Sequence, residues 1–115
     1  MTSPFSFYDD VLRQHPTPST INWALSMYDI HIRIAAAKHP KATPKNIDKA
    51  LDDKDYFVRF HAISNPNATR ANINKAIKDK DFNIRIAAVK HRKATKAQKE
   101  QVTNDPELIS YLLKR

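Results

Sequence analysis

The chain repeats itself every 26 residues. Three consecutive segments, which begin at Asp29, Asp55 and Asp81, align without a gap: DIHIRIAAAKHPKATPKNIDKALDDK, DYFVRFHAISNPNATRANINKAIKDK and DFNIRIAAVKHRKATKAQKEQVTNDP. A shorter upstream copy, TPSTINWALSMY, begins at Thr17. A fixed period of this length indicates units that stack on one another because none of them buries its apolar residues alone.

Each unit carries the signals of two short helices. The aspartate at its first position is a good N-cap, and a His-Pro or Asn-Pro step interrupts the helix that follows. Thr43 caps the second helix, where Pro44 is tolerated in the first turn. The sequence therefore predicts an all-α chain, 1–115, that forms a single domain of about four and a half units. Their approximate bounds are 3–28, 29–54, 55–80 and 81–106, with a capping helix at 106–115.

The first helix of each unit is apolar on two sides. Counted from Ile30, one apolar arc holds Ile34 and Ala37, and a nearly opposite arc holds Ile32 and Ala36. A helix of this kind suits a layer that lies between two other layers. At the end of the chain, four apolar residues with helical spacing are expected to seal the last layer: Leu108, Ile109, Leu112 and Leu113.

The segment DYFVRFHAISNP resembles the short HEAT-like repeats and the leucine-rich variant repeats, which combine an Asp-x-x-Val-Arg-x-Ala helix with an Asn-Pro turn. The resemblance covers about residues 15–107. It implies a right-handed α-solenoid whose concave face is formed by the helix that carries the arginine. The variant family replaces one helix by a 3₁₀ turn, so the second helix of each unit is either α or 3₁₀. The resemblance implies a shape and no particular function.

Two charged columns recur at the same period: Arg33, Arg59 and Arg85, and Asp53, Asp79 and Asp105. Three evenly spaced guanidinium groups are able to grip successive phosphates. The helical wheel instead places each arginine between the two apolar arcs, where it meets the turns between helices. We therefore predict a structural ladder of Arg–Asp pairs, joined by charge-assisted hydrogen bonds, as HEAT-like families have.

The formal net charge is +8, and the second half of the chain supplies the excess. A cluster of cations precedes Glu100 without an intervening acid, a density that raises the local concentration of anions. We predict that this cluster and one upstream lysine bind a nucleic-acid backbone; a merely solubilising face is the alternative. The predicted binding residues are Lys38, Lys90, Arg92, Lys93, Lys96 and Lys99.

The polar side of the first helix differs between the units. It carries His31 in one unit, Phe57 and His61 in the next, and Asn83 in the third. These side chains are expected on the concave face, where an aromatic ring and histidines suit stacking and phosphate contact. Positions that merely face solvent also vary, so both interpretations stay open.

Composition and motifs argue against an enzyme. The chain has no glycine for a phosphate-cradling loop and no cysteine for a disulfide, a thiolate metal site or a nucleophile. No metal-ligand spacing is present, and His39 and His91 share a loop column that suits hydrogen bonding. We expect a non-enzymatic binding module without a cofactor or a metal.

The function predicted first is binding of DNA or RNA, and the alternative is an adaptor for an acidic protein. A repair enzyme, as some HEAT-like proteins are, is a third hypothesis without an identifiable catalytic carboxylate. No apolar run reaches the length of a membrane span, and MTSPFSFYDD lacks the features of a signal peptide. We expect a cytoplasmic protein that does not contact membranes, and its oligomeric state stays open.

Overall fold

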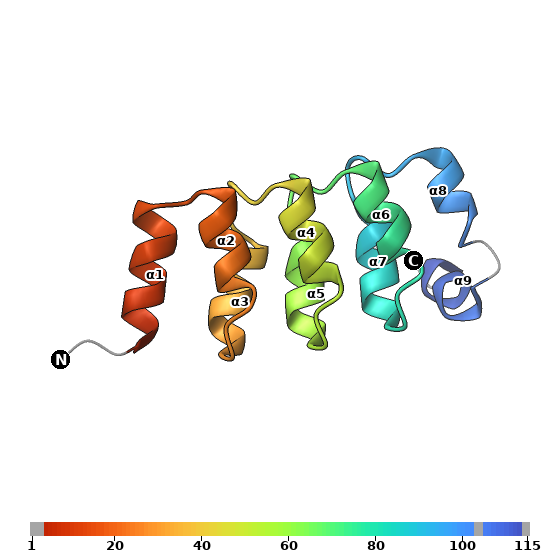
Figure 1. Ribbon diagram of the computed structural model, residues 1–115. Helices are drawn as coiled ribbons and strands as arrows, with labels where there is room; N and C mark the ends of the chain where they lie inside the picture. Colours follow the sequence, from red (N-terminus) through yellow and green to blue (C-terminus); the bar gives the residue numbers. More distant parts are fainter. Residues whose placement is uncertain (1–3, 103–104, 114–115) are drawn as a thin grey trace.

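The computed structural model describes residues 4–102 and 105–113, and in these ranges every regular element is an α-helix (Figure 1). The prediction of an all-α chain is confirmed. The helices are α1 (Pro4–Gln14), α2 (Pro18–Ala24), α3 (Ile30–Ala37), α4 (Pro44–Leu51), α5 (Tyr56–Ser64), α6 (Arg70–Ala76), α7 (Phe82–Lys90), α8 (Lys96–Glu100) and α9 (Pro106–Leu113).

The helices form two rows. The first row contains α3, α5 and α7, which pack on one another in this order, and the second row contains α2, α4 and α6. Successive helix pairs follow one another along the long axis of the molecule (Figure 1). The dimensions of 51 × 22 × 21 Å describe a rod that is two helices thick.

The second helix of each pair is an α-helix with the same N-terminal cap. The capping threonines are Thr17, Thr43, Thr69 and Thr95. Each accepts a hydrogen bond from the backbone N–H of the third helical residue, whose side chain in turn accepts one from the backbone N–H of the threonine. The sequence left open whether the second helix of each unit is α or 3₁₀. In the described residues it is an α-helix in every case, namely in α2, α4, α6 and α8.

The aspartate caps follow the prediction in two units of three. Asp29 accepts hydrogen bonds from the backbone of His31 and Ile32, and Asp55 accepts one from Phe57. The prediction is wrong for Asp81, which makes no side-chain cap bond because its carboxylate binds the Arg59 guanidinium instead.

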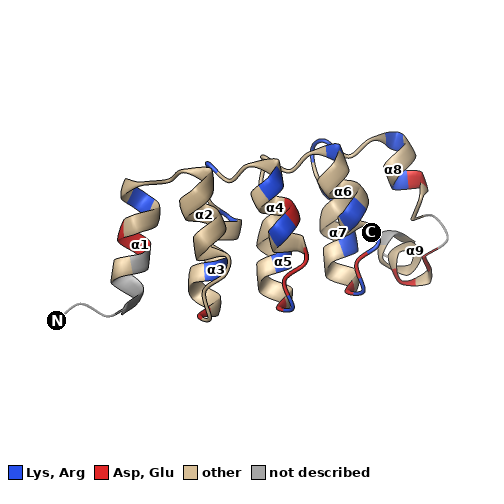
Figure 2. Ribbon diagram, viewed as in Figure 1, with Lys and Arg blue, Asp and Glu red and all other residues tan. Residues whose placement is uncertain are grey.

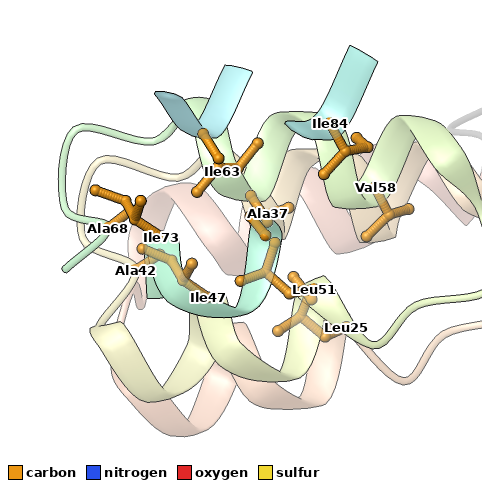
Figure 3. Close-up of a cluster of buried hydrophobic side chains, with 14 of the residues drawn as sticks. Leu25, Ala37, Ala42, Ile47, Leu51, Val58, Ile63, Ala68, Ile73 and Ile84 are labelled. Carbon is orange, nitrogen blue, oxygen red and sulfur yellow. The ribbon is translucent and has the colours of Figure 1, made fainter. Parts of the chain in front are cut away.

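Apolar columns fill the space between the two rows (Figure 3). Ile47 and Ile73 are fully buried, as are Val58 and Ile84 of the other row. Ala62 is also fully buried, and its small side chain lets neighbouring helices approach closely. The labelled side chains in Figure 3 form one continuous cluster across successive pairs.

The last helix departs from the pattern. Figure 1 shows α9 nearly end-on, whereas the preceding helices run across the view. Leu108 is buried, but Ile109 and Leu113 are exposed, so the prediction that they seal the last layer is wrong. Because α9 lies across the end of the rod and packs on α7, only one side of it is covered. The side chain of Leu112 is outside the described ones.

Candidate nucleic-acid interface

The turns that lead from the second row back to the first carry most of the acids. We call this side of the rod the acidic edge, formed by residues 25–29, 52–55, 77–81 and 105–107. Its acidic residues are Asp29, Asp52, Asp53, Asp55, Asp79, Asp81, Asp105 and Glu107. Figure 2 shows these turns as the red segments on the lower side of the molecule. Lys54, Lys78 and Lys80 lie among them.

The two charged columns meet at this edge. Arg33 Nε lies 2.9 Å from Asp53 Oδ2, and Arg59 Nε lies 3.0 Å from Asp79 Oδ2. The third pair is made by Arg85, whose Nε lies 2.6 Å from an oxygen of Asp105. The ladder therefore joins each arginine to the turn at the end of its own unit.

The arginines also hold the turns at the end of the preceding unit. Arg59 Nη1 donates to the carbonyl oxygens of Asp53 and Lys54, at 3.0 and 3.1 Å. Its Nη2 donates to Asp81, and the equivalent nitrogen of Arg85 donates to Glu107. These donors are used within the protein, and the Arg59 side chain is only 5% exposed. The phosphate-gripping alternative for this column therefore has no support in the structure.

The last pair of the ladder also shifts two pKa values. The hydrogen bond from Arg85 holds the pKa of Asp105 below its ordinary value, together with backbone hydrogen bonds from Leu108 and Glu107. Desolvation lowers the pKa of Arg85, but its hydrogen bonds to Asp105 and Glu107 outweigh this, so the pKa is raised overall. Both shifts favour the charged forms of the two partners.

The opposite turns lead from the first row to the second, and their Lys and Arg residues are not accompanied by any Asp or Glu. We call this side the basic edge, formed by residues 38–45, 64–70 and 90–96, and none of these residues is acidic. Its cations are Lys38, Lys41, Lys45, Arg70, Lys90, Arg92, Lys93 and Lys96. All eight are exposed, and none forms an ion pair with a described residue.

Uncharged side chains hold the basic edge together. His39 Nε2 lies 3.1 Å from the carbonyl oxygen of Leu12, and His91 Nε2 lies 3.0 Å from that of Asn65. Between them, Asn65 Nδ2 donates to the carbonyl oxygens of Ala37 and His39, at 2.9 and 3.0 Å. This column is thus a second ladder, built from neutral groups and backbone carbonyls.

A further set of neutral bonds lies at the start of the second helices. The Asn46 amide donates to the carbonyl oxygen of Pro18, and the Asn72 amide donates to that of Pro44, both at 3.2 Å. Gln98 repeats the contact with the carbonyl oxygen of Arg70, at 2.7 Å. The basic edge therefore needs none of its cations for holding one unit to the next.

The six predicted binding residues do not form one group. Lys90, Arg92, Lys93 and Lys96 belong to the basic edge. Lys38 lies on the same edge two units away. Lys99 lies in the last turn of α8, outside the basic edge. It is close to Lys96 in the sequence, but Lys96 begins this short helix and Lys99 lies near its end.

Sequence reasoning missed three cations of the basic edge, namely Lys41, Lys45 and Arg70. Two of them were detectable, because Lys41 shares a repeat column with Lys93, and Arg70 shares one with Lys96. Summing charge by repeat column, instead of along the chain, is the signal that identifies this edge.

The predicted concave-face residues lie along the first row of helices. His31, Phe57 and Asn83 are exposed, and Phe57 leaves 56% of its surface to solvent. His61 is half-buried against Phe60, with the ring centroids 5.8 Å apart. Desolvation, and then the charge of Lys38, lowers the pKa of His61 below its ordinary value. At neutral pH this imidazole is therefore a neutral hydrogen-bonding group.

A groove of about 810 Å³ opens on the same row, where α5, α7 and α9 come together. It is lined by Tyr56, Phe60, Ile63, Ser64, Pro66, Asn83, Ile86, Ala87, Lys90, His91, Arg92 and Tyr111. Two of the lining residues are small: Ser64 stands in the repeat column of Lys38 and Lys90, and Ala87 in that of Ala35 and His61. None of the lining residues is acidic.

Among the described residues, no group of His, Asp or Glu side chains is arranged to hold a metal ion. None of the described helices has the length and apolar character needed to cross a bilayer.

Comparisons with protein-family models, with curated proteins and with solved structures found no match. The resemblance to HEAT-like repeats therefore rests on the residues of this chain. A function has to be inferred from the surface chemistry described above.

Proposed function

We propose that this chain is a non-enzymatic module that binds the backbone of nucleic acid along its basic edge. The observation that carries the proposal is the separation of charge between the two edges. Eight exposed cations share one edge without an acid, while most carboxylates lie on the other. Lys and Arg contacts to phosphates supply most of the affinity of non-specific binding, because they release condensed counterions.

We also propose that the chain is a short right-handed α-solenoid of HEAT-like repeats, with the first row of helices on its concave face. Support comes from contacts that recur at the repeat period. The Arg33–Asp53 pair returns as Arg59–Asp79, and the Asn46–Pro18 hydrogen bond returns in the next unit. Such an array presents the basic turns of successive units in one line.

The binding expected from this edge is independent of base sequence. Its lysines reach outward from turns, and contacts to phosphates position a protein without reading bases. Affinity should fall steeply between about 50 mM and about 200 mM salt, because each phosphate contact adds to the salt dependence.

Two variants of equal charge test the proposal. The basic-edge variant is Arg92→Glu/Lys93→Glu/Lys96→Glu, and its matched control is the acidic-edge variant Lys54→Glu/Lys78→Glu/Lys80→Glu. Both remove three exposed cations and add three carboxylates. Binding to labelled single-stranded and duplex DNA and RNA is measured by fluorescence anisotropy at both salt concentrations.

The basic-edge variant should lose at least tenfold in affinity, and its salt dependence should weaken by about one unit of slope for each contact removed. The acidic-edge control should bind much more tightly than the basic-edge variant. Equal losses in the two variants would show an effect of net charge alone and contradict the proposal. If no nucleic acid binds, and an acidic protein from the native host binds after nuclease treatment, the adaptor function replaces it.

A further inference from the structure

The groove between α5, α7 and α9 combines aromatic walls with a cationic end. Tyr56 and Phe60 of α5 lie on one side, with ring centroids 6.0 Å apart and planes inclined by only 23°. Tyr111 of α9 belongs to the other side, since α7 packs between α5 and α9. Aromatic rings of this kind offer π-faces to a flat ligand.

The floor and the mouth of the groove come from α7 and the turn that follows it. Ile86 and Ala87 supply apolar surface, and Asn83 supplies an amide. Lys90 and Arg92 lie at the end of the groove that adjoins the basic edge. Lys90 is held there by Tyr111, whose hydroxyl lies 3.3 Å from Nζ and whose ring centroid lies 5.7 Å from it.

This combination is absent from the preceding units. The column of Phe60 contains Ile34 and Ile86, and the column of Tyr56 contains Ile30 and Phe82. Tyr111 stands in the column that holds the ladder arginines in earlier units. Tyr111, which follows the last complete repeat, thus adds an aromatic side chain that this column lacks in the earlier units.

We propose that the groove receives an unpaired base of a single-stranded nucleic acid, stacked against Phe60 and Tyr56, while the adjoining phosphate meets Lys90 and Arg92. The inference rests on the proposed function and adds the class of nucleic acid. The volume of about 810 Å³ lies in the usual range for a small-molecule site. The absence of carboxylates among the lining residues matches an anionic ligand.

A duplex does not satisfy this site. Its bases are already stacked and paired, so that placing one between the walls requires unstacking it first. Single strands present their bases freely, and stacking on an aromatic side chain strengthens binding without requiring a particular sequence. The groove therefore gives the basic edge a preference for single strands.

The inference is tested by measuring the binding of four nucleic-acid probes, each about 12 nucleotides long. They are an oligothymidylate, an oligouridylate, an abasic strand with the same number of phosphates, and a duplex of the same length. The wild-type chain should bind at least one of the two base-carrying strands about tenfold more tightly than the abasic strand. Comparison of the thymidylate and uridylate affinities identifies the preferred sugar.

Phe60→Ile and Tyr56→Ile isolate the contribution of the rings, because isoleucine occupies the same columns in other units and keeps an apolar side chain there. Both variants should bind the base-carrying strands only as tightly as the abasic strand, with abasic binding unchanged. Tyr28→Leu is the matched control, since this tyrosine is 98% exposed on the acidic edge. It should retain the preference of the wild type.

Two outcomes separate this inference from the proposed function. If the abasic strand and the duplex bind as tightly as both base-carrying strands, or if both isoleucine variants keep the preference, the groove does not receive a base. The basic edge then stands alone, provided that binding still depends on Arg92, Lys93 and Lys96. If none of the probes binds, both proposals are overturned.

Discussion

The two edges of the rod solve the same structural task with different chemistry. At the acidic edge, charged pairs such as Arg59–Asp81 join one unit to the next. At the basic edge, Asn65 and the histidines of its column do so with uncharged hydrogen bonds to backbone carbonyls. The carboxylates of one edge therefore take part in ion pairs and caps, whereas the cations of the other edge form no ion pair with a described residue.

This difference shows how a repeat protein combines stability with a charged surface. A buried charge must be paired to be tolerated, and the ladder arginines meet this demand through several partners each. Neutral bonds at the basic edge allow Lys41, Arg92 and Lys93 to remain exposed, without an ion-pair partner in the part of the chain that the structure describes. Like charges on this edge repel one another weakly in water, and an anionic ligand relieves that repulsion.

The largest expected effect comes from removing a charged pair. Arg59→Ala leaves Asp79, whose side chain is 9% exposed, without its guanidinium. We expect the free energy of unfolding to fall by about 3–5 kcal/mol, measured by urea denaturation, because breaking a buried pair strands one charge. Lys93→Ala on the basic edge is the control and should change it by less than about 0.5 kcal/mol. Similar losses in both variants would contradict the division of roles.

A smaller loss is expected from removing a neutral bond of the basic edge. Asn65 is 2% exposed and bonds to two backbone carbonyls of the preceding unit. Asn65→Leu should cost about 1–3 kcal/mol in unfolding free energy, because it leaves buried carbonyl groups without a donor. Asn65→His restores the residue type of the neighbouring units and should recover part of the loss. A leucine variant as stable as the wild type would show that these two hydrogen bonds do not stabilise the folded chain.

The edges should also respond differently to acid. The pKa of Asp105 is lower in the folded chain than its ordinary value of 3.8. Its contribution to stability is therefore fully present above that value and is lost as the pH falls through the folded pKa. Thermal unfolding between neutral pH and about pH 2 should show this loss, and Asp105→Asn should flatten the curve in that window. An unchanged curve for the variant would contradict the role of Asp105 in the ladder.

Periodicity in the sequence predicts contacts in which both partners recur. Arg33 and Asp53 repeat together, so their pairing is predictable from the wheel and the period. The Asn65 bond was not predictable, because its partners are backbone carbonyls, which leave no trace in the sequence. The role of Asp81 was not predictable either, because an aspartate at this position is able to cap the helix or to form an ion pair.

The candidate site was predictable only in part. The cluster before Glu100 identifies the end of the basic edge, but the sequence does not show that Lys99 lies outside this edge, in the last turn of α8. The contribution of Tyr111 to the groove was not predictable, because it depends on the orientation of α9. That helix follows the last complete repeat, so the period no longer specifies how it packs.

Lysine acylation with and without a bound single-stranded oligonucleotide, read by mass spectrometry, compares the two edges in one measurement. The basic-edge lysines Lys41, Lys93 and Lys96 should be protected by the oligonucleotide. Lys54, Lys78 and Lys80 on the acidic edge should react at the same rate in both samples. Protection of the acidic-edge lysines, or equal reactivity of both sets, would contradict the assignment of the nucleic-acid interface to the basic edge.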